Sequence, residues 1–141
     1  ATFCAYPKYI LGISSDGCDV CHPGYDMAGT SKAVLETLTR YLSLKLRPLG
    51  TRVNSIRPGF LKTDSSTATF GEQTLQTLAE RVPGLLLNPA AIANVCVGLC
   101  SGLMDAITGQ IITVDEGWSL VSPISYLTDN TLPQPFPQLK E

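Results

Sequence analysis

Three short runs of residues with strand character, each separated from the next by a helical pattern, limit the folds open to this chain of 141 residues. The runs cover residues 8–15, 51–57 and 109–114, and the first is apolar enough to be buried on both faces. Residues 25–47 carry apolar side chains at three- to five-residue steps, which predicts a helix that a Pro-Leu-Gly turn ends. This order predicts an α/β fold, the C-terminal half of a doubly wound parallel sheet.

The remaining segments are expected to be helices, a loop and a tail. Residues 72–82 and 88–101 are predicted helices, the second capped by an asparagine with proline at its first position. The small polar residues 65–70 predict a mobile loop. Alternating prolines near the C-terminus predict a tail without regular structure. We therefore expect two parts, residues 1–122 as one half of a Rossmann-type domain and residues 123–141 as a Pro-rich tail.

Composition excludes some classes of partner from the prediction. The net charge is −2 and the 10 basic residues are scattered, whereas a nucleic-acid-binding surface normally shows clustered Lys and Arg. No run approaches the roughly 18 apolar residues of a transmembrane helix, and the first residues do not resemble a signal peptide. We expect a cytoplasmic protein with neither a membrane nor a nucleic acid as partner.

The five cysteines are expected to be reduced thiols, because their number is odd and no secretory signal is apparent. Cys18, Cys21 and His22 resemble half a zinc site or a redox pair. A second pair of ligands is needed, and His22 is the one histidine of the chain. Cys96 and Cys100 lie on an apolar helix, where cysteines usually pack as small hydrophobes. Loop and core cysteines are therefore favoured over a metal site.

Two residues of the long predicted helix and one before it form a candidate catalytic set. Tyr25 and Lys32 are seven residues apart, so at about 100° per residue they return to nearly the same helix face. A phenol is a poor acid at neutral pH until a nearby ammonium favours its anion. Ser15, at the end of the first strand, is placed to orient a carbonyl oxygen. Packing and solvent exposure also produce such a spacing, and Ser15 could simply cap the strand.

The chain has no phosphate-binding turn of the form G-x-G-x-x-G among its 12 glycines. Three parallel strands also leave an open sheet edge, and such edges are normally paired or covered. We therefore expect an N-terminal half of the same fold, supplied either by a cleaved segment or by a separate chain.

Four segments, in order and spacing, resemble the short-chain dehydrogenase/reductase family. They are Ile13-Ser14-Ser15, Ser31-Lys32-Ala33, residues 52–59 with Leu61 and Thr63, and residues 107–115. The resemblance covers about residues 8–121, and it implies that residues 1–122 are the C-terminal half of a Rossmann-type reductase domain.

The position of the tyrosine points to a branch within this resemblance. Most members of the family place their tyrosine four residues before the lysine, where this chain has Ala28. The seven-residue spacing of Tyr25 and Lys32 resembles the divergent enoyl-acyl-carrier-protein reductase branch. Ser15, ten residues before Tyr25, instead matches the place of the serine in ketone-reducing members.

The resemblance implies a role for each matching residue. Tyr25 would protonate or stabilise the enolate or alkoxide oxygen, with Ser15 as a further catalytic residue, and Lys32 would hold the nicotinamide ribose of NADPH or NADH. Further contacts with the cofactor are implied for Pro58, Gly59, Leu61 and Thr63. Residues 65–70 fall where the family has its substrate-covering loop. Glu116 stands where the family usually has glycine.

These roles imply an NAD(P)H-dependent reductase of an enoyl thioester or related enone, active only with the N-terminal half. A ketoreductase of secondary metabolism and a non-catalytic structural subunit of a reductase complex are the alternatives. The implied partners are a small-molecule or acyl-thioester substrate, the N-terminal half of the fold, and further subunits in a tetramer-like homo- or hetero-oligomer.

Overall fold

The computed structural model describes residues 6–122, whose internal contacts divide them into two compact units. The first unit holds residues 6–58 and 88–114, and the second holds residues 59–87 and 115–122. The first unit contains β1 (Tyr9–Ile13), the 3-10 helix η1 (Asp16–Cys18), α1 (Asp26–Leu46), the 3-10 helix η2 (Arg47–Leu49), β2 (Arg52–Pro58), α4 (Pro89–Cys100) and β3 (Ile111–Val114). The second contains α2 (Asp64–Phe70), α3 (Glu72–Arg81) and the 3-10 helix η3 (Trp118–Leu120).

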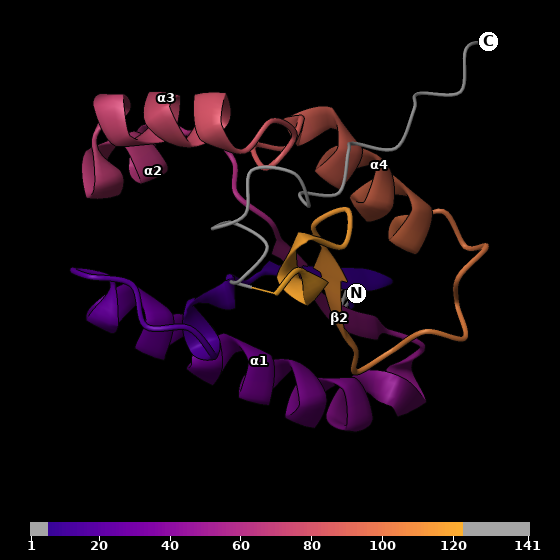
Figure 1. Cartoon of the computed structure of the whole chain (residues 1–141). Coiled ribbons are helices and arrows are strands. Elements are labelled where there is room, and N and C mark those ends of the chain that lie inside the picture. The colour runs from indigo at the N-terminus through magenta and orange to yellow at the C-terminus, as the bar shows by residue number, and fades with distance from the viewer. Residues whose placement is uncertain (1–5, 123–141) are drawn as a thin grey trace, which may run out of the picture. The chain divides into compact units, whose positions relative to one another are not determined.

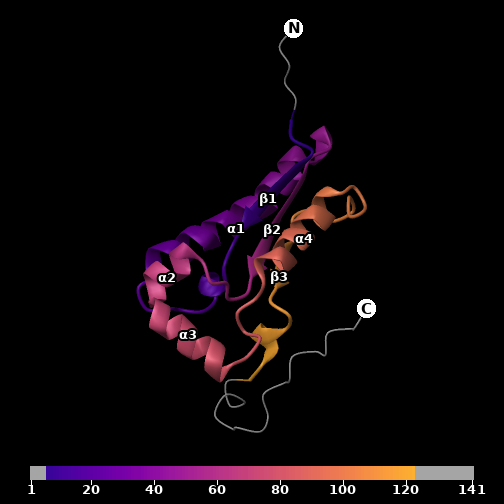
Figure 2. The same cartoon turned by 90° about the horizontal axis from the view of Figure 1, so that it is seen from above.

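The three strands form one parallel sheet in the order β1-β2-β3, which confirms the predicted α/β fold. Ile13 pairs with Ile56, and Ser14 continues this pairing beyond β1 by donating its N–H to the Ile56 carbonyl oxygen at 2.8 Å. α1 lies along one face of the sheet and α4 over the other (Figure 1), and the view from above shows α1 running beside β1 and β2 (Figure 2). The carboxyl ends of the strands share one edge, from which the β1–α1 loop leaves.

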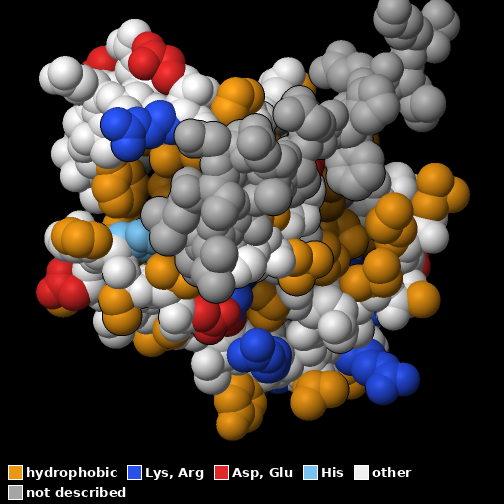
Figure 3. Space-filling view, viewed as in Figure 1, with side chains coloured by type: hydrophobic (Ala, Val, Ile, Leu, Met, Phe, Trp, Pro, Cys, Tyr) orange, Lys and Arg blue, Asp and Glu red, His pale blue; other side chains and the backbone are white. Residues whose placement is uncertain are grey.

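α1 is a helix of 21 residues, in agreement with the prediction for residues 25–47, but its fully buried residues are glycine or polar. The buried residues are Gly29, Glu36, Thr39 and Ser43. Leu38 and Tyr41, whose spacing helps to predict the helix, are exposed. Apolar side chains accordingly reach the surface along the lower edge of the space-filling view, where α1 runs (Figure 3). The apolar stripe therefore predicts the helix but not the side that meets the sheet.

A close approach of strand and helix explains why small polar residues fill this face. A Cβ atom on Gly12 of β1 would lie 2.4 Å from the Ser55 Oγ atom and 3.2 Å from the Leu35 Cδ1 atom. The Ser55 hydroxyl shares a hydrogen bond of 2.7 Å with Thr39 Oγ1, so the two buried polar groups satisfy each other. Side chains larger than these would push α1 away from the sheet.

Asn54 of β2 has a structural role, because its side-chain amide bonds to the backbone at both ends. It is 2% exposed. Its Nδ2 atom donates to the Ile107 carbonyl oxygen at 3.0 Å, and its Oδ1 atom accepts from the Gln110 N–H at 3.0 Å. The side chain therefore fixes the loop that leads into β3.

The loop expected at residues 65–70 is instead a helix, α2. The small polar residues that suggest a loop instead satisfy the first turn of a helix. The Ser66 N–H donates to Thr63 Oγ1 at 3.1 Å, while the Thr63 N–H donates to Ser66 Oγ at 2.8 Å. α3 follows and confirms the helix predicted at 72–82, and Leu75 is buried on it.

The predictions for the helix that begins after Asn88 and for the C-terminal tail have different outcomes. Asn88 caps α4 by accepting from the Ala90 N–H at 2.9 Å, which confirms that helix start. The Pro-rich tail, residues 123–141, lies outside the described residues. Within residues 6–122, no helix combines the length and apolar character needed to cross a bilayer.

Replacing Gly12 with alanine should lower the free energy of unfolding by about 1–3 kcal/mol, because the new methyl group overlaps Ser55 and Leu35. The matched control is Gly98→Ala in α4, where a Cβ atom would meet Met104 Cε at an ordinary 3.6 Å and alanine is the better helix former. Denaturant titration should show a loss for the first variant and none for the second. Equal midpoints for wild type and Gly12→Ala would contradict the close approach.

Candidate active site

Tyr25 lies at the N-terminus of α1, where its ring packs against the turn that follows β1. A Cβ atom on Gly17 would lie 2.6 Å from two ring carbons of Tyr25, and one on Gly29 would lie 2.5 Å from the Gly17 carbonyl oxygen. These two glycines therefore let η1 lie directly against the first turn of α1. Tyr25 is the N-cap residue, with φ −109° and ψ 8°, and its side chain makes no capping hydrogen bond.

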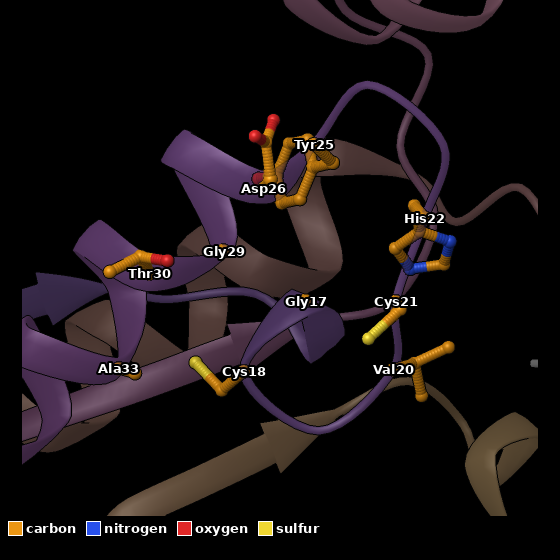
Figure 4. Close-up of a pocket in the computed structure, with 10 residues that line it drawn as sticks. All are labelled: Gly17, Cys18, Val20, Cys21, His22, Tyr25, Asp26, Gly29, Thr30 and Ala33. Atoms are coloured by element: carbon orange, nitrogen blue, oxygen red, sulfur yellow. The ribbon is translucent and has the colours of Figure 1, made fainter.

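A pocket of about 370 Å³ opens beside this ring (Figure 4). Its walls come from the β1–α1 loop and the start of α1, both within the first unit. The lining residues are Gly17, Cys18, Val20, Cys21, His22, Tyr25, Asp26, Gly29, Thr30 and Ala33. Most of these side chains are small or apolar, so the Tyr25 phenol stands beside a space suited to a small organic group.

Lys32 and Ser15 lie near this loop but do not line the pocket. The Lys32 Nζ atom is exposed and donates to the Ile13 carbonyl oxygen, the last of β1, at 2.8 Å. Ser15 caps η1, because its Oγ atom accepts from the Gly17 N–H at 3.1 Å and donates to Asp16 Oδ1 at 3.1 Å. The structure thus places all three predicted catalytic residues on or beside one loop, with the serine hydroxyl engaged in a cap.

Four of the five predicted cofactor contacts follow one another along the chain from the end of β2. Pro58 ends β2 in the first unit, while Gly59, Leu61 and Thr63 belong to the second unit. A Cβ atom on Gly59 would lie 2.9 Å from Asp115 Cβ, so glycine is required there. Thr63 caps α2, and its hydroxyl is used within that cap.

A buried carboxylate that the sequence does not reveal connects the elements around the loop. Glu36 of α1 is 4% exposed. Its Oε1 atom accepts from Arg57 Nε and from Ser14 Oγ, both at 2.6 Å, and its Oε2 atom accepts from Arg57 Nη2 at 2.7 Å. The Cys18 thiol donates to Oε1 at 3.4 Å. This Glu36 cluster, formed by Ser14, Cys18, Glu36 and Arg57, holds β1, η1 and β2 to α1.

Electrostatics favour the charged forms of both ions in this cluster. The Arg57 guanidinium, which outweighs the effect of burial, lowers the pKa of Glu36 to about 2. The hydrogen bond from Arg57 to Glu36 raises the pKa of Arg57, and a hydrogen bond to Asp19 adds a smaller effect in the same direction. The paired fork of two N–H···O bonds is the geometry in which a guanidinium holds a carboxylate most firmly.

Of the two cysteines in this region, Cys18 is half-buried and Cys21 is exposed. Cys18 and Cys21 both line the pocket, and the four described cysteines form no disulfide with one another. Within residues 6–122 no group of three or more His, Cys, Asp or Glu side chains is arranged to hold a metal ion. The Cys18 thiol instead belongs to the Glu36 cluster.

Comparison with known families identifies the family of this chain. A family model described as "Enoyl-(Acyl carrier protein) reductase" matches residues 6–119. The chain therefore belongs to this family of short-chain dehydrogenases/reductases, as the four sequence segments predict.

Individual relatives agree with this assignment. The enoyl-[acyl-carrier-protein] reductase [NADH] of Synechocystis is 37% identical over 101 residues, which are 70% of this chain and 39% of the relative. The 3-oxoacyl-[acyl-carrier-protein] reductase of Aquifex aeolicus is 40% identical over 89 residues, or 62% of this chain and 36% of the relative. The crystal structure of the Aquifex aeolicus enoyl-[acyl-carrier-protein] reductase (NADH) matches with a TM-score of 0.70 at 30% identity, covering 81% of this chain and 45% of that one. The chain thus spans less than half the length of these relatives.

Acidification should weaken the protein through the Glu36 cluster. Because the folded-state pKa of Glu36 is about 2 and its ordinary value is 4.5, the stability it supplies is complete above about pH 5 and is lost as the pH falls toward 2. The shift corresponds to about 3 kcal/mol. Denaturant titrations from pH 7 to pH 2 should therefore show a smaller fall in the free energy of unfolding for Glu36→Gln than for wild type.

The control for this measurement is Glu80→Gln, which removes an exposed carboxylate that accepts a hydrogen bond from Gln76 of the same helix. Its pH profile should follow that of wild type. Parallel profiles for wild type and Glu36→Gln would refute the assignment of the acid-labile stability to Glu36.

Proposed function

We propose that the protein to which this chain belongs is an NAD(P)H-dependent reductase of an enoyl thioester or related enone. The observation that carries the proposal is the Tyr25–Lys32 pair, seven residues apart at the start of α1, in a chain that belongs to an enoyl reductase family. The enoyl reductase relatives, whose names specify NADH, support the cofactor class.

Each residue of the pair has a chemical task in this proposal. Tyr25 gives a proton to, or stabilises, the enolate oxygen that forms on reduction. The Lys32 ammonium, exposed and held by one backbone carbonyl, has two further N–H donors for a ribose hydroxyl. Ser15 is a further polar group beside the substrate.

The cofactor, NADPH or NADH, supplies the hydride when bound. Lys32, Pro58, Gly59, Leu61 and Thr63 are the residues of this chain proposed to hold it. Gly59 lets the backbone lie against Asp115 and Leu87, because a Cβ atom on it would come within 2.9 Å of each of their side chains. We propose that the N-terminal half of the same fold, as a cleaved segment or a separate chain, supplies the phosphate-binding turn.

Two further parts of the proposal concern assembly and location. Large apolar side chains are exposed along α1, namely Met27, Val34, Leu38, Tyr41 and Leu44. Burial of such side chains against another subunit would stabilise a homo- or hetero-oligomer, tetramer-like as in the family. We place the protein in the cytoplasm on the free thiols of its described cysteines.

Ketone reduction is the second candidate, favoured by the 40% identity to a 3-oxoacyl reductase and by Ser15. The cap in which Ser15 takes part engages its hydroxyl, which weighs against it as an oxyanion contact. A non-catalytic subunit is less well supported, because such a subunit has no chemical need for both Tyr25 and Lys32.

The complete protein should reduce a crotonyl thioester with NADH or NADPH faster than it reduces an acetoacetyl thioester. Tyr25→Phe should lower kcat by about 10²- to 10⁴-fold, because it removes the proton donor and keeps the ring. Tyr6→Phe, at an exposed site before β1, is the matched control and should retain wild-type kcat. Reduction of the acetoacetyl thioester alone would transfer the proposal to a ketoreductase, and full activity of Tyr25→Phe would remove its catalytic role.

Residues 1–141 alone should not bind the dinucleotide, since this chain lacks a G-x-G-x-x-G turn. Isothermal titration of the isolated chain with NADPH and NADH should give no measurable heat of binding, whereas the complete protein should titrate. Micromolar binding by the isolated chain would overturn the proposal that the N-terminal half supplies the phosphate-binding turn.

A further inference from the structure

His22, the one histidine of the chain, stands between an acidic residue and the proposed proton donor. Its Nε2 atom lies 3.0 Å from Asp16 Oδ2, and its side chain is 17% exposed. The His22 and Tyr25 rings meet edge to face, with centroids 6.0 Å apart and planes at 81°. The Tyr25 N–H also donates to the His22 carbonyl oxygen at 3.1 Å. His22 therefore contacts Tyr25 through both its ring and its backbone.

Asp16 connects this histidine to the predicted serine. One carboxylate oxygen of Asp16 pairs with His22 Nε2, and the other accepts from Ser15 Oγ at 3.1 Å. A carboxylate oxygen accepts hydrogen bonds, so the form of His22 with a proton on Nε2 is the one that makes this hydrogen bond. A continuous line of contacts thus runs from Ser15 through Asp16 and His22 to the ring of Tyr25.

Tyr25 needs such support because of where it lies. As the N-cap residue it has non-helical dihedral angles, so the preceding turn of a helix does not restrict its side chain. Gly17 closes one side of the ring, and the edge-to-face contact with His22 lies on another. Both rings line the same pocket (Figure 4). The phenol would otherwise rotate, and an error of about 1 Å in a reacting group costs up to about 100-fold in rate.

We propose that Asp16 and His22 act as a positioning pair that holds the Tyr25 ring beside Gly17 and so aims its hydroxyl group. This inference rests on the proposed function for its kinetic consequence, but its structural part, the orientation of Tyr25, is independent of the reaction. His22 is a positioning residue, since it acts through Tyr25.

The experiment is a double-mutant cycle on the complete protein, with two readouts. His22→Ala and Asp16→Ala should each lower kcat for the crotonyl thioester by about 10- to 100-fold, with KM changed by less than about threefold. The double variant should lose no more than the larger single loss, because the two residues act as one unit. Asp16→Asn, whose amide oxygen still accepts from Nε2, should recover most of kcat.

The second readout follows the ring itself. In protein labelled with 3-fluorotyrosine, the ¹⁹F resonance of Tyr25 is identified by its loss in Tyr25→Phe. It should move in His22→Ala and Asp16→Ala and keep its wild-type position in Asp19→Asn. Asp19 lies in the same loop but bonds to Arg57, so it is the matched control.

These readouts separate the possible failures. An unmoved Tyr25 resonance in both alanine variants, or additive losses of kcat in the cycle, overturns the positioning pair. A wild-type protein that reduces neither thioester overturns the proposed function, and the ¹⁹F cycle then still decides the positioning pair. If an alanine variant does not fold, Asp16→Asn is compared with wild type instead. A Tyr25 resonance that moves in Asp16→Asn to its position in the unfolded protein contradicts the positioning pair, because the Asp16→Asn side chain can still accept the hydrogen bond from His22.

Discussion

The ion pair between Glu36 and Arg57 is the interaction on which the first unit depends. Four hydrogen bonds converge on one buried carboxylate, and their donors come from the residue after β1, from η1 and from β2. A buried charge is costly unless its bonds are complete, so the pair supports the fold only while every partner is present. Loss of one partner would leave an uncompensated ion between α1 and the sheet. The loop that carries Ser15 and Tyr25 leaves the sheet beside this cluster, so its shape depends on the same bonds.

The architecture could be predicted largely because local signals agree with it. Strand runs, proline and glycine breaks, and the Asn88 cap all point to the elements that form. The error at residues 65–70 has a specific cause, since Ser and Thr satisfy helix starts as readily as they populate loops. The buried face of α1 was not predictable from hydrophobic periodicity, because it is made of glycine, glutamate, threonine and serine. A stripe of small and polar residues at positions 29, 36, 39 and 43 was the available signal.

Some residues of the candidate site could likewise be predicted from the sequence, and others could not. Tyr25, Lys32 and Ser15 could be found from their spacing, because the chemistry requires those residue types at the end of one strand and the start of one helix. Glu36 and Arg57 could not, since a charged residue in a helix or strand is normally read as solvent-exposed and their partners lie far away in sequence. Gly17 and Gly29 were equally hidden, because their importance lies in the room that they leave for neighbouring atoms. Asp16 and His22 could be noted as polar residues, but their link to Tyr25 depends on the shape of the loop.

The polar face of α1 also determines how this helix can move. An apolar helix face can slide by a fraction of a turn, because dispersion contacts change gradually with distance. Hydrogen bonds of 2.6–2.7 Å join Ser14 and Arg57 to Glu36, and Ser55 to Thr39. They allow no such drift, since their strength falls steeply with distance and angle. α1 is therefore confined to one axial and rotational setting on the sheet, and any alternative setting must break several bonds together. The start of this helix is therefore held in place, so any movement of the Tyr25 side chain must come from the loop that precedes it.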